Sequence, residues 1–495
     1  MGAVRISTPL ELKIFNSLTN LPRLEHGAFA DFEQSPSIGE HGDGSFPSFQ
    51  PVAQTLGFGY AIDTGIQHYE VAKRMEVAMP HDHPTTYDHA LSYWAVNADA
   101  SDGSANDKLT DEDLVLVLDA SSVLLQLPPS ILLQRYFRIN ARANNLVPQL
   151  YDTNVADLIR QTVIVPAQKE CIGHRDLTAN RHHNHITEGT LSSDIDGTLT
   201  DLQLMSWEST RPEQMHSGSF MGPVGDLRRY LRRVKDKIQR DKVHLGQVQQ
   251  VGTHQSILSE VLREQELWRR ATGEPKDLAR RIATQDEFEY HVGLDYTQEL
   301  FHPTSLAECD GAFIPLADQE VAKKESSRRG ISPPRVQIPN DVAKLDNPLA
   351  MFGGKFSQGN YGWGNLTLFT DLWTASVPVV IQQGPSRQGL KELWAMWWEK
   401  TWFFPYLRVL LDISIYSRAT DPLLRLTTDN NSLDISGYGS TLYPRMPRLF
   451  IREGHIEEWN LEVAHWNSIC RSATETAEGN NLWYNEVFRD GKGPL

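Results

Sequence analysis

The sequence predicts an α+β, helix-rich fold in one large subunit with two or three packed regions. Its 495 residues exceed the size at which a single hydrophobic core keeps growing, and 40% of them are hydrophobic. Short apolar segments with branched side chains precede a long helical middle, and strands and helices show no regular βαβ alternation. We therefore expect sheets and helices that are grouped separately along the chain.

The strand-like segments are short and flanked by polar turns. Residues 114–118 read LVLVL, and residues 123–127 and 163–165 are similarly apolar and branched. Residues 428–445 are rich in Asn, Ser and Gly, which is typical of turns between short strands. These segments supply the β component of the predicted fold.

The helical middle covers residues 224–290. From residue 224 onward, apolar residues recur every three or four positions, which predicts an amphipathic helix. These apolar positions are Leu227, Leu231, Val234 and Ile238. A second helix is expected from Thr253, an acceptable N-cap, to a point before Gly273, and a third over about residues 275–284.

Residues 322–340 are the best candidate for a boundary between two regions of the chain, and we predict that they form an exposed connecting loop. Two basic pairs, Pro333-Pro334 and Pro339 suit neither a helix nor a central strand. This loop separates a mixed main region, residues 1–330, from a Trp- and Gly-rich region, residues 341–495. The aromatic segment 393–411 needs a large apolar partner, so we expect both regions to share one core.

Charge and composition narrow the classes of function. A net charge of −16 excludes a protein whose whole surface binds nucleic acid, because such binding needs clustered Lys and Arg. The three cysteines lie far apart and form no Cys-x-x-Cys site. The first residues contain no apolar signal core, and charges interrupt the longest apolar stretch, 393–411. We therefore expect a cytoplasmic protein without membrane contact.

One segment, Asp194-Ile-Asp-Gly-Thr-Leu-Thr-Asp201, resembles the first motif of the haloacid dehalogenase phosphatase superfamily. The resemblance implies a Mg²⁺-dependent phosphatase in which Asp194 is the nucleophile and Asp196 the general acid/base. Covalent phosphoryl transfer needs such a pair, since one carboxylate attacks while the other protonates the leaving oxygen. No apolar strand precedes the motif, and no acidic pair for the metal follows it. We favour a polar Asp-Gly turn and keep the phosphatase as the alternative.

Histidines gather in two segments. The first holds His81, His83 and His89, and the second holds His174, His182, His183 and His185. His-x-His on a strand can present two imidazoles to one metal, but prolines bracket the first pair. We expect surface or interface histidines, with no metal and no cofactor. A metal site would be favoured if the two histidine segments lay next to each other in the folded protein.

Two further groups are candidate contact residues. Residues 228–242 hold eight Lys/Arg against two Asp, a local charge of +6. The arginines Arg228, Arg229, Arg232 and Arg233 could contact phosphate or a neighbouring subunit, and a solvated face paired with acidic neighbours is the favoured alternative. The tryptophans Trp394, Trp398 and Trp402 share one face at helical spacing. They are expected in the core or as anchors between subunits.

These features predict a structural, self-assembling shell protein, such as a capsid or coat protein. The chain is long, carries no complete catalytic motif and is acidic, which suits a container that encloses RNA with only loose contact. Capsids of small double-stranded RNA viruses share this general character, although no motif carries the comparison. The expected partner is the protein itself in a large homo-oligomer, and the phosphatase with Asp194 and Asp196 remains the alternative.

Overall fold

A computed structural model describes part of the chain, and every structural statement below concerns that part. Its fold is α+β, with helices and mixed sheets. The described residues are 10–16, 61–63, 111–118, 123–151, 156–169, 212, 214–245, 254–270, 284, 287–304, 307, 309–350, 362–382, 397–416, 423–428, 431–437, 448–452, 459–463 and 483–493.

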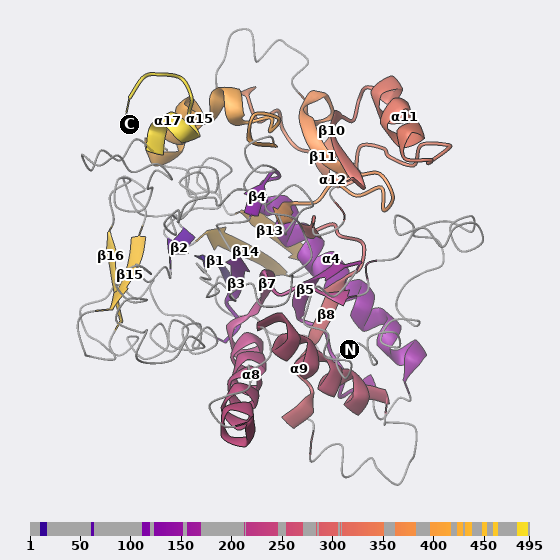
Figure 1. The fold of residues 1–495 in the computed structure, drawn as a ribbon, viewed down its shortest axis with the longest axis vertical. Helices are drawn as coiled ribbons and strands as arrows, with labels where there is room; N and C mark the ends of the chain where they lie inside the picture. The colour runs from indigo at the N-terminus through magenta and orange to yellow at the C-terminus, as the bar shows by residue number, and fades with distance from the viewer. Residues whose placement is uncertain are drawn as a thin grey trace, which may run out of the picture.

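Within these residues the largest sheet has 11 strands and lies in the middle of the molecule (Figure 1). Its main path is β16 (Trp459–Val463), β15 (Arg448–Arg452), β2 (Ala61–Asp63), β1 (Leu10–Asn16), β3 (Leu114–Leu118), β7 (Ser219–Pro223), β5 (Val163–Gln168) and β6 (Gln214–Met215). Three strands lie off this path: β14 (Asn431–Gly437) pairs with β1 and with β13 (Leu424–Thr428), and β8 (Val292–Asp295) pairs with β5.

The central strands other than β7 share one direction. β1 is parallel to β2 and to β3, and β5 is parallel to β8. β7 lies between β3 and β5 and is antiparallel to both, so β3 and β5 also run the same way. The sequence showed no βαβ rhythm because the segments that join these strands are long and irregular in length. The parallel pairs are therefore a feature that the sequence pattern did not predict.

Two smaller sheets pack beside the large one. In the first, β12 (Val380–Gln382) lies between β4 (Val123–Leu125) and β9 (Phe301–Pro303), antiparallel to β4 and parallel to β9. In the second, β10 (Gly311–Pro315) pairs with β11 (Thr367–Asp371) in antiparallel fashion. Both sheets join segments that are distant in sequence.

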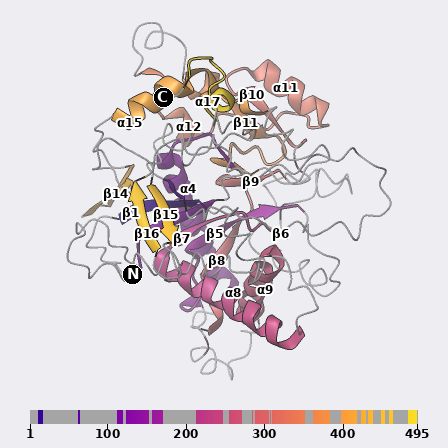
Figure 2. The ribbon, with the colours of Figure 1, turned by 60° about the vertical axis from the view of Figure 1, so that its left-hand side comes forward.

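The helices lie on both sides of the central sheet (Figures 1 and 2). They are α4 (Pro129–Leu150), α8 (Val224–Leu245), α9 (His254–Arg270), α11 (Gln319–Arg328), α12 (Asn340–Ala343), α15 (Leu407–Tyr416) and α17 (Trp483–Val487), with 3-10 turns at η9 (Trp363–Asn365) and η10 (Phe404–Tyr406). The predicted helices at residues 224 and 253 are confirmed as α8 and α9. The third predicted helix lies largely outside the described residues.

Strand β3 explains the layered arrangement. All five of its residues are buried, and they alternate between two hydrophobic clusters. Leu114, Leu116 and Leu118 face the cluster that contains α4, the small sheets and the tryptophans. Val115 and Val117 face the cluster formed with α8 and α9. A strand that is apolar on both faces is the expected sequence for the middle layer of three.

Residues 322–340 differ from the exposed loop that the sequence predicted. The first part continues α11, which begins after Asp318; the Asp318 side chain accepts a hydrogen bond from the backbone N–H of Val321. Beyond the helix the segment is irregular, but Ile331 and Val336 are buried in the hydrophobic cluster of α4. The prolines exclude regular structure over residues 333–339, and the apolar residues between them still pack inward.

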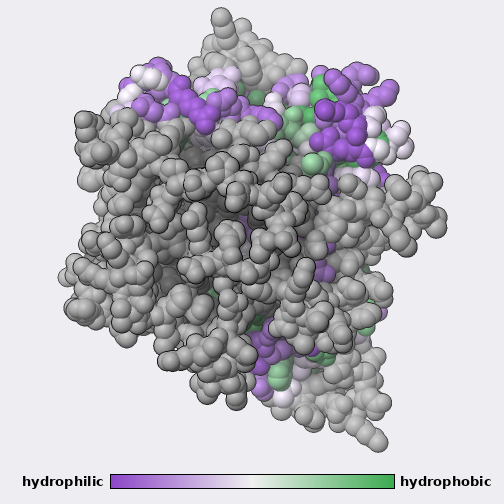
Figure 3. All heavy atoms as spheres, viewed as in Figure 1, coloured by the Kyte–Doolittle hydropathy of each residue, from purple (hydrophilic) through white to green (hydrophobic). Residues whose placement is uncertain are grey.

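The visible surface of the described residues is predominantly hydrophilic. On the face drawn in Figure 3, hydrophilic residues cover the regions of α11 and of α15 and α17, with a small hydrophobic area beside α11. None of the described helices combines the length and the hydropathy that a membrane crossing requires.

Candidate functional site

Several strands of the central sheet end at one edge, and most of the residues at these ends are polar. Asn16, the last residue of β1, is in register with Asp63, the last residue of β2. On its other side Asn16 is in register with Leu118, the end of β3, and Leu118 is in register with Ser219, the first residue of β7. We call this edge, together with the carboxyl ends of β5 and β8, the polar edge.

The polar edge continues beyond β7. Strand β5 ends at Gln168 and is followed by Lys169, and β8 ends at Asp295. Pro166 of β5 is in register with Asp295, so both strands finish at the same edge. In β5 and β8, buried residues that are mostly apolar are followed by a polar residue at this edge. A backbone pattern of this kind concentrates hydrogen-bonding and charged groups where several parallel strands end.

Ser219 connects the polar edge to the first small sheet. Its hydroxyl donates to the side-chain oxygen of Gln382, which ends β12, over 3.0 Å. The amide of Gln382 lies against Gly218, where a Cβ atom would be only 1.4 Å from Gln382 Nε2. Glycine at residue 218 therefore leaves the space that the Gln382 side chain fills. The carboxyl end of β12 is thus held at the start of β7.

A buried polar cluster of Lys169, Gln298, His302, Asp310 and Asp371 lies beside this edge. The ammonium group of Lys169 is 2.6 Å from a carboxylate oxygen of Asp310, and both side chains are 3% exposed. His302 Nδ1 is 3.0 Å from Gln298 Oε1 and 3.6 Å from Asp371 Oδ2, and His302 is completely buried. Gln298 Nε2 donates to the carbonyl of Ala167 in β5 over 2.9 Å. We call this group the His302 cluster.

Burial sets the protonation of two groups near the edge. Burial is the main reason that the pKa of His302 is lowered to about 4; the carboxylate of Asp371 raises this pKa, and the charge of Lys169 contributes to lowering it. His302 is therefore neutral at pH 7. Burial also raises the pKa of Asp295 to about 6, even though its carboxylate accepts backbone N–H bonds from Glu299, Leu300 and Phe301. Perturbed titratable groups of this kind cluster at functional sites.

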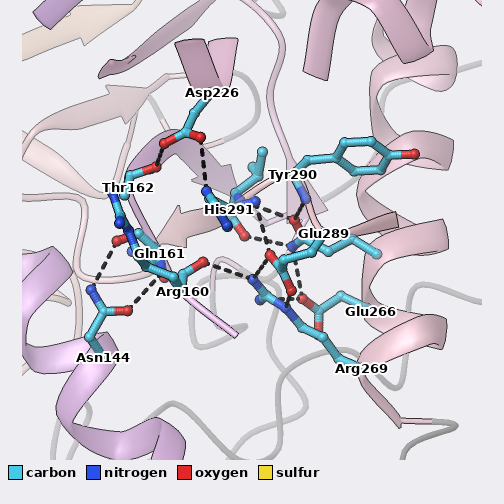
Figure 4. Close-up of polar contacts among 12 residues, drawn as sticks. Asn144, Arg160, Gln161, Thr162, Asp226, Glu266, Arg269, Glu289, Tyr290 and His291 are labelled. Atoms are coloured by element: carbon cyan, nitrogen blue, oxygen red, sulfur yellow. Dashed lines mark hydrogen bonds and ion pairs between the residues drawn. The ribbon is translucent and has the colours of Figure 1, made fainter. Parts of the chain in front are cut away.

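The opposite edge of the sheet carries a different network, drawn in Figure 4. Thr162 precedes β5, His291 precedes β8, and Asp226 lies in the first turn of α8. The Thr162 hydroxyl donates to Asp226 Oδ2 over 2.6 Å, and His291 Nδ1 lies 2.9 Å from Asp226 Oδ1. His291 has a left-handed backbone, with φ of 61°, which a non-glycine residue adopts only when its surroundings hold it there.

Neighbouring contacts provide that restraint. The N–H of His291 donates to Glu289 Oε1, and its carbonyl accepts from the N–H groups of Thr162 and Val163. Arg269 at the end of α9 binds Glu289 through Nε and Nη2, over 2.7 and 2.5 Å (Figure 4). These contacts tie the starts of β5, β8 and α8 to α9. They are fully used in holding the elements together, so we assign this network a structural role.

The basic residues predicted on α8 are largely occupied within the chain. Arg233 and Lys237 bind Glu264 of α9 over 2.8 and 2.9 Å. Arg228 lies 3.2 Å from Asp111, and Arg229 lies 3.7 Å from Asp226. Arg232 is exposed. These ion pairs agree with the alternative interpretation of the sequence, in which acidic residues of the same chain pair with the basic face of this helix.

Two of the three candidate tryptophans, Trp398 and Trp402, are buried within the chain. Trp398 donates its indole N–H to the carbonyl of Val487 over 3.0 Å, and Trp402 donates to the carbonyl of Gln126 over 2.9 Å. Their exposed fractions are 1% and 6%. A turn separates the two residues, so no continuous helix face carries both. Trp394 lies outside the described residues.

The remaining candidates from the sequence also lie outside the described residues. They are Asp194 and Asp196, the histidines His81, His83 and His89, and the histidines His174, His182, His183 and His185. Among the residues that the structure does describe, no group of three or more His, Cys, Asp or Glu side chains could hold a metal ion. The phosphatase alternative and the expectation that the histidines bind no metal therefore stay predictions.

Sequence reasoning missed the polar edge and the His302 cluster. A signal was present, because Gln168 and Asp295 each directly follow a short run of mostly apolar residues, and Lys169 comes next after Gln168. The register that brings these strand ends together is not visible in the sequence. Comparison of the chain with protein-family models found no match, and comparison with curated protein sequences found none either.

Proposed function

We propose that the chain is an enzyme that binds a small polar ligand at the polar edge of its central sheet. The observation that carries the proposal is the row of strand ends formed by Asp63, Asn16, Leu118 and Ser219. In sheets with parallel strands, ligands bind outside the carboxyl ends, at the point where the strand order reverses. Here β2 and β3 lie on opposite sides of β1, which provides such a reversal.

The surroundings of this edge support a catalytic ligand site. The His302 cluster supplies a neutral imidazole, two carboxylates and an ion-paired lysine, all buried. Burying titratable groups costs free energy, and buried groups with perturbed pKa values are often found at functional sites. By contrast, the network at the opposite edge leaves its polar groups bonded to each other.

A pair of matched substitutions tests the proposal. Asp63→Asn changes one carboxylate at the polar edge without changing the shape of the side chain. Asp111→Asn makes the same change near the amino end of β3, at the opposite edge of the sheet. Ligands are first found by thermal shift of the full chain with a panel of nucleotides, sugar phosphates, amines and amino acids.

We expect Asp63→Asn to weaken binding of the ligand by about tenfold or more, because a hydrogen bond to a charged group is lost. Asp111→Asn should leave the affinity unchanged. Isothermal titration calorimetry measures both. Equal affinities in the parent and both variants would show that the ligand binds elsewhere.

The shell protein and the phosphatase stay predictions beside this proposal. A shell assembles to megadalton particles, whereas an enzyme of this size forms a monomer or a small oligomer. Mass photometry at moderate salt separates these outcomes. Phosphatase activity that Asp194→Asn abolishes would favour the alternative with Asp194 and Asp196.

A further inference from the structure

The hydrogen bonds of Gln298 fix which nitrogen of His302 carries the proton. Gln298 Nε2 donates to the carbonyl of Ala167, so its oxygen is the atom that faces His302 Nδ1. An amide oxygen is only an acceptor, and Nδ1 must therefore be the protonated nitrogen. Because burial keeps the imidazole neutral above a pKa of about 4, Nε2 carries a free lone pair.

Apart from Asp310 Oδ2, which is ion-paired with Lys169, two buried acceptors in the cluster receive no hydrogen bond from the described residues. They are His302 Nε2 and Asp371 Oδ2. The other oxygen of Asp371 is held by the backbone N–H groups of Trp373 and Thr374, over 2.8 and 3.1 Å. His302 and Asp371 are both 0% exposed, so these two atoms have been removed from bulk water. A buried acceptor without a donor is energetically unfavourable, and both atoms would be stabilised by a hydrogen-bond donor.

The charges of the cluster define that partner. Lys169 and Asp310 neutralise each other, His302 is neutral, and Asp371 leaves a net charge of −1. A protonated amine carries one positive charge and only donates hydrogen bonds, so it matches both the charge and the two acceptors. A hydroxyl group would supply one donor and no charge. A carboxylate or phosphate group would be repelled.

We infer that the His302 cluster binds a protonated primary amine, whose N–H groups donate to His302 Nε2 and Asp371 Oδ2. The inference rests on the proposed function, because it assigns the amine to the ligand of the polar edge. It defines the ligand class as small polar amines, and His302 contributes an acceptor rather than a charge.

Methylammonium is the probe for this site, with methanol and acetate as probes of similar size that lack either the charge or the donors. Binding to the full chain is measured by isothermal titration calorimetry at pH 7. Two substitutions separate the nitrogens of His302. His302→Gln keeps an acceptor near the place of Nε2, and His302→Asn keeps a donor near the place of Nδ1 but removes the acceptor.

We expect methylammonium to bind at millimolar concentration and the two other probes not to bind. His302→Asn should weaken methylammonium binding by about tenfold, while His302→Gln should retain most of it. Circular dichroism checks that both variants are folded. Lys323→Gln, which removes one exposed positive charge on α11, is the control and should bind as the parent does.

The inference is overturned if methylammonium does not bind, or if both His302 variants bind it equally well. It is also overturned if only His302→Gln loses binding, because the contact through Nδ1 would then be the one that matters. Failure of the proposed function is a separate result: methylammonium would still bind through His302, while Asp63→Asn would leave ligand affinity unchanged.

Discussion

Arg135 is one of the largest fully buried side chains in the described part of the protein. Its guanidinium donates to both carboxylate oxygens of Asp341, over 2.8 and 3.2 Å, and to the carbonyls of Glu299 and Val377. A single side chain thereby joins α4 to α12 and to the segments before β9 and β12. Burying a charge is unfavourable unless every donor is used, and here the pairing is bidentate.

Arg135→Met should therefore destabilise the protein strongly. The substitution removes the bidentate partner of the buried Asp341 carboxylate and leaves it only the longer contact to Arg138, at 3.5 Å. Breaking a buried ion pair in this way typically costs about 3–5 kcal/mol. Arg425→Met is the matched control, because Arg425 and Asp434 form an ion pair whose side chains are 59% and 41% exposed. That change should cost less than about 1 kcal/mol. Urea unfolding measures both, and equal losses would contradict the structural role of Arg135.

At the scale of helices and strands, the sequence predicted those elements whose pattern is local. The apolar spacing of α8 was readable, and Leu227, Leu231 and Val234 are buried as that spacing requires. Helix α4 was missed, because Pro128 directly precedes it, Pro129 is its first residue and Pro148 lies in its last turn. Proline at the first helical position is compatible with a helix, since the missing N–H has no partner there. The polar residues Arg135 and Asn140 also interrupt its apolar face.

Asp226 links α8 to the strands and makes the stability of this region dependent on pH. Burial alone raises the pKa of Asp226, but the hydrogen bond and charge of His291, the Thr162 hydroxyl and Arg229 outweigh it and hold the pKa below its usual value. A carboxyl whose pKa is lower in the folded state contributes stability above its unfolded pKa. That contribution is lost as the pH falls through the folded pKa.

Asp226→Asn should accordingly lower the free energy of unfolding at pH 7 by about 1–3 kcal/mol, because the charged hydrogen bonds are lost. The variant should also lose less of its remaining stability than the parent when the pH falls below about 4. Unfolding in urea across this pH range measures both effects. Asp236→Asn, on the exposed side of the same helix, should follow the parent curve. A parallel shift of the Asp226→Asn curve at all pH values would contradict the linkage.

For the whole molecule, the polar edge depends on contacts between residues that are far apart in sequence. Asn16, Leu118 and Ser219 become neighbours only through strand register. The acceptors of the His302 cluster likewise come from β9 and β11, and the positive charge comes from the residue after β5. Local patterns predict the strands themselves, but register depends on how their faces are buried together. For this reason the sequence indicated much of the secondary structure and little of the site.

The same long-range pairing decides how the chain responds to a cut at residue 328. Arg328 is 69% exposed at the end of α11 and is followed closely by Gly330, so trypsin should cleave there early. The two fragments share every sheet of the described residues. β12 lies between β4 and β9, β11 pairs with β10, and β14 pairs with β1. One hydrophobic cluster also contains residues from both sides of the cut.

We therefore expect the nicked protein to remain a single species. Size-exclusion chromatography after brief digestion should give one peak at the mass of the intact chain, and a denaturing gel of that peak should show two fragments. Separating them should require urea, because removing β12 would expose the edges of β4 and β9 and a large apolar surface. Two fragments that elute apart in native buffer, each with native helical circular dichroism, would mean that residues 329–495 form a core of their own.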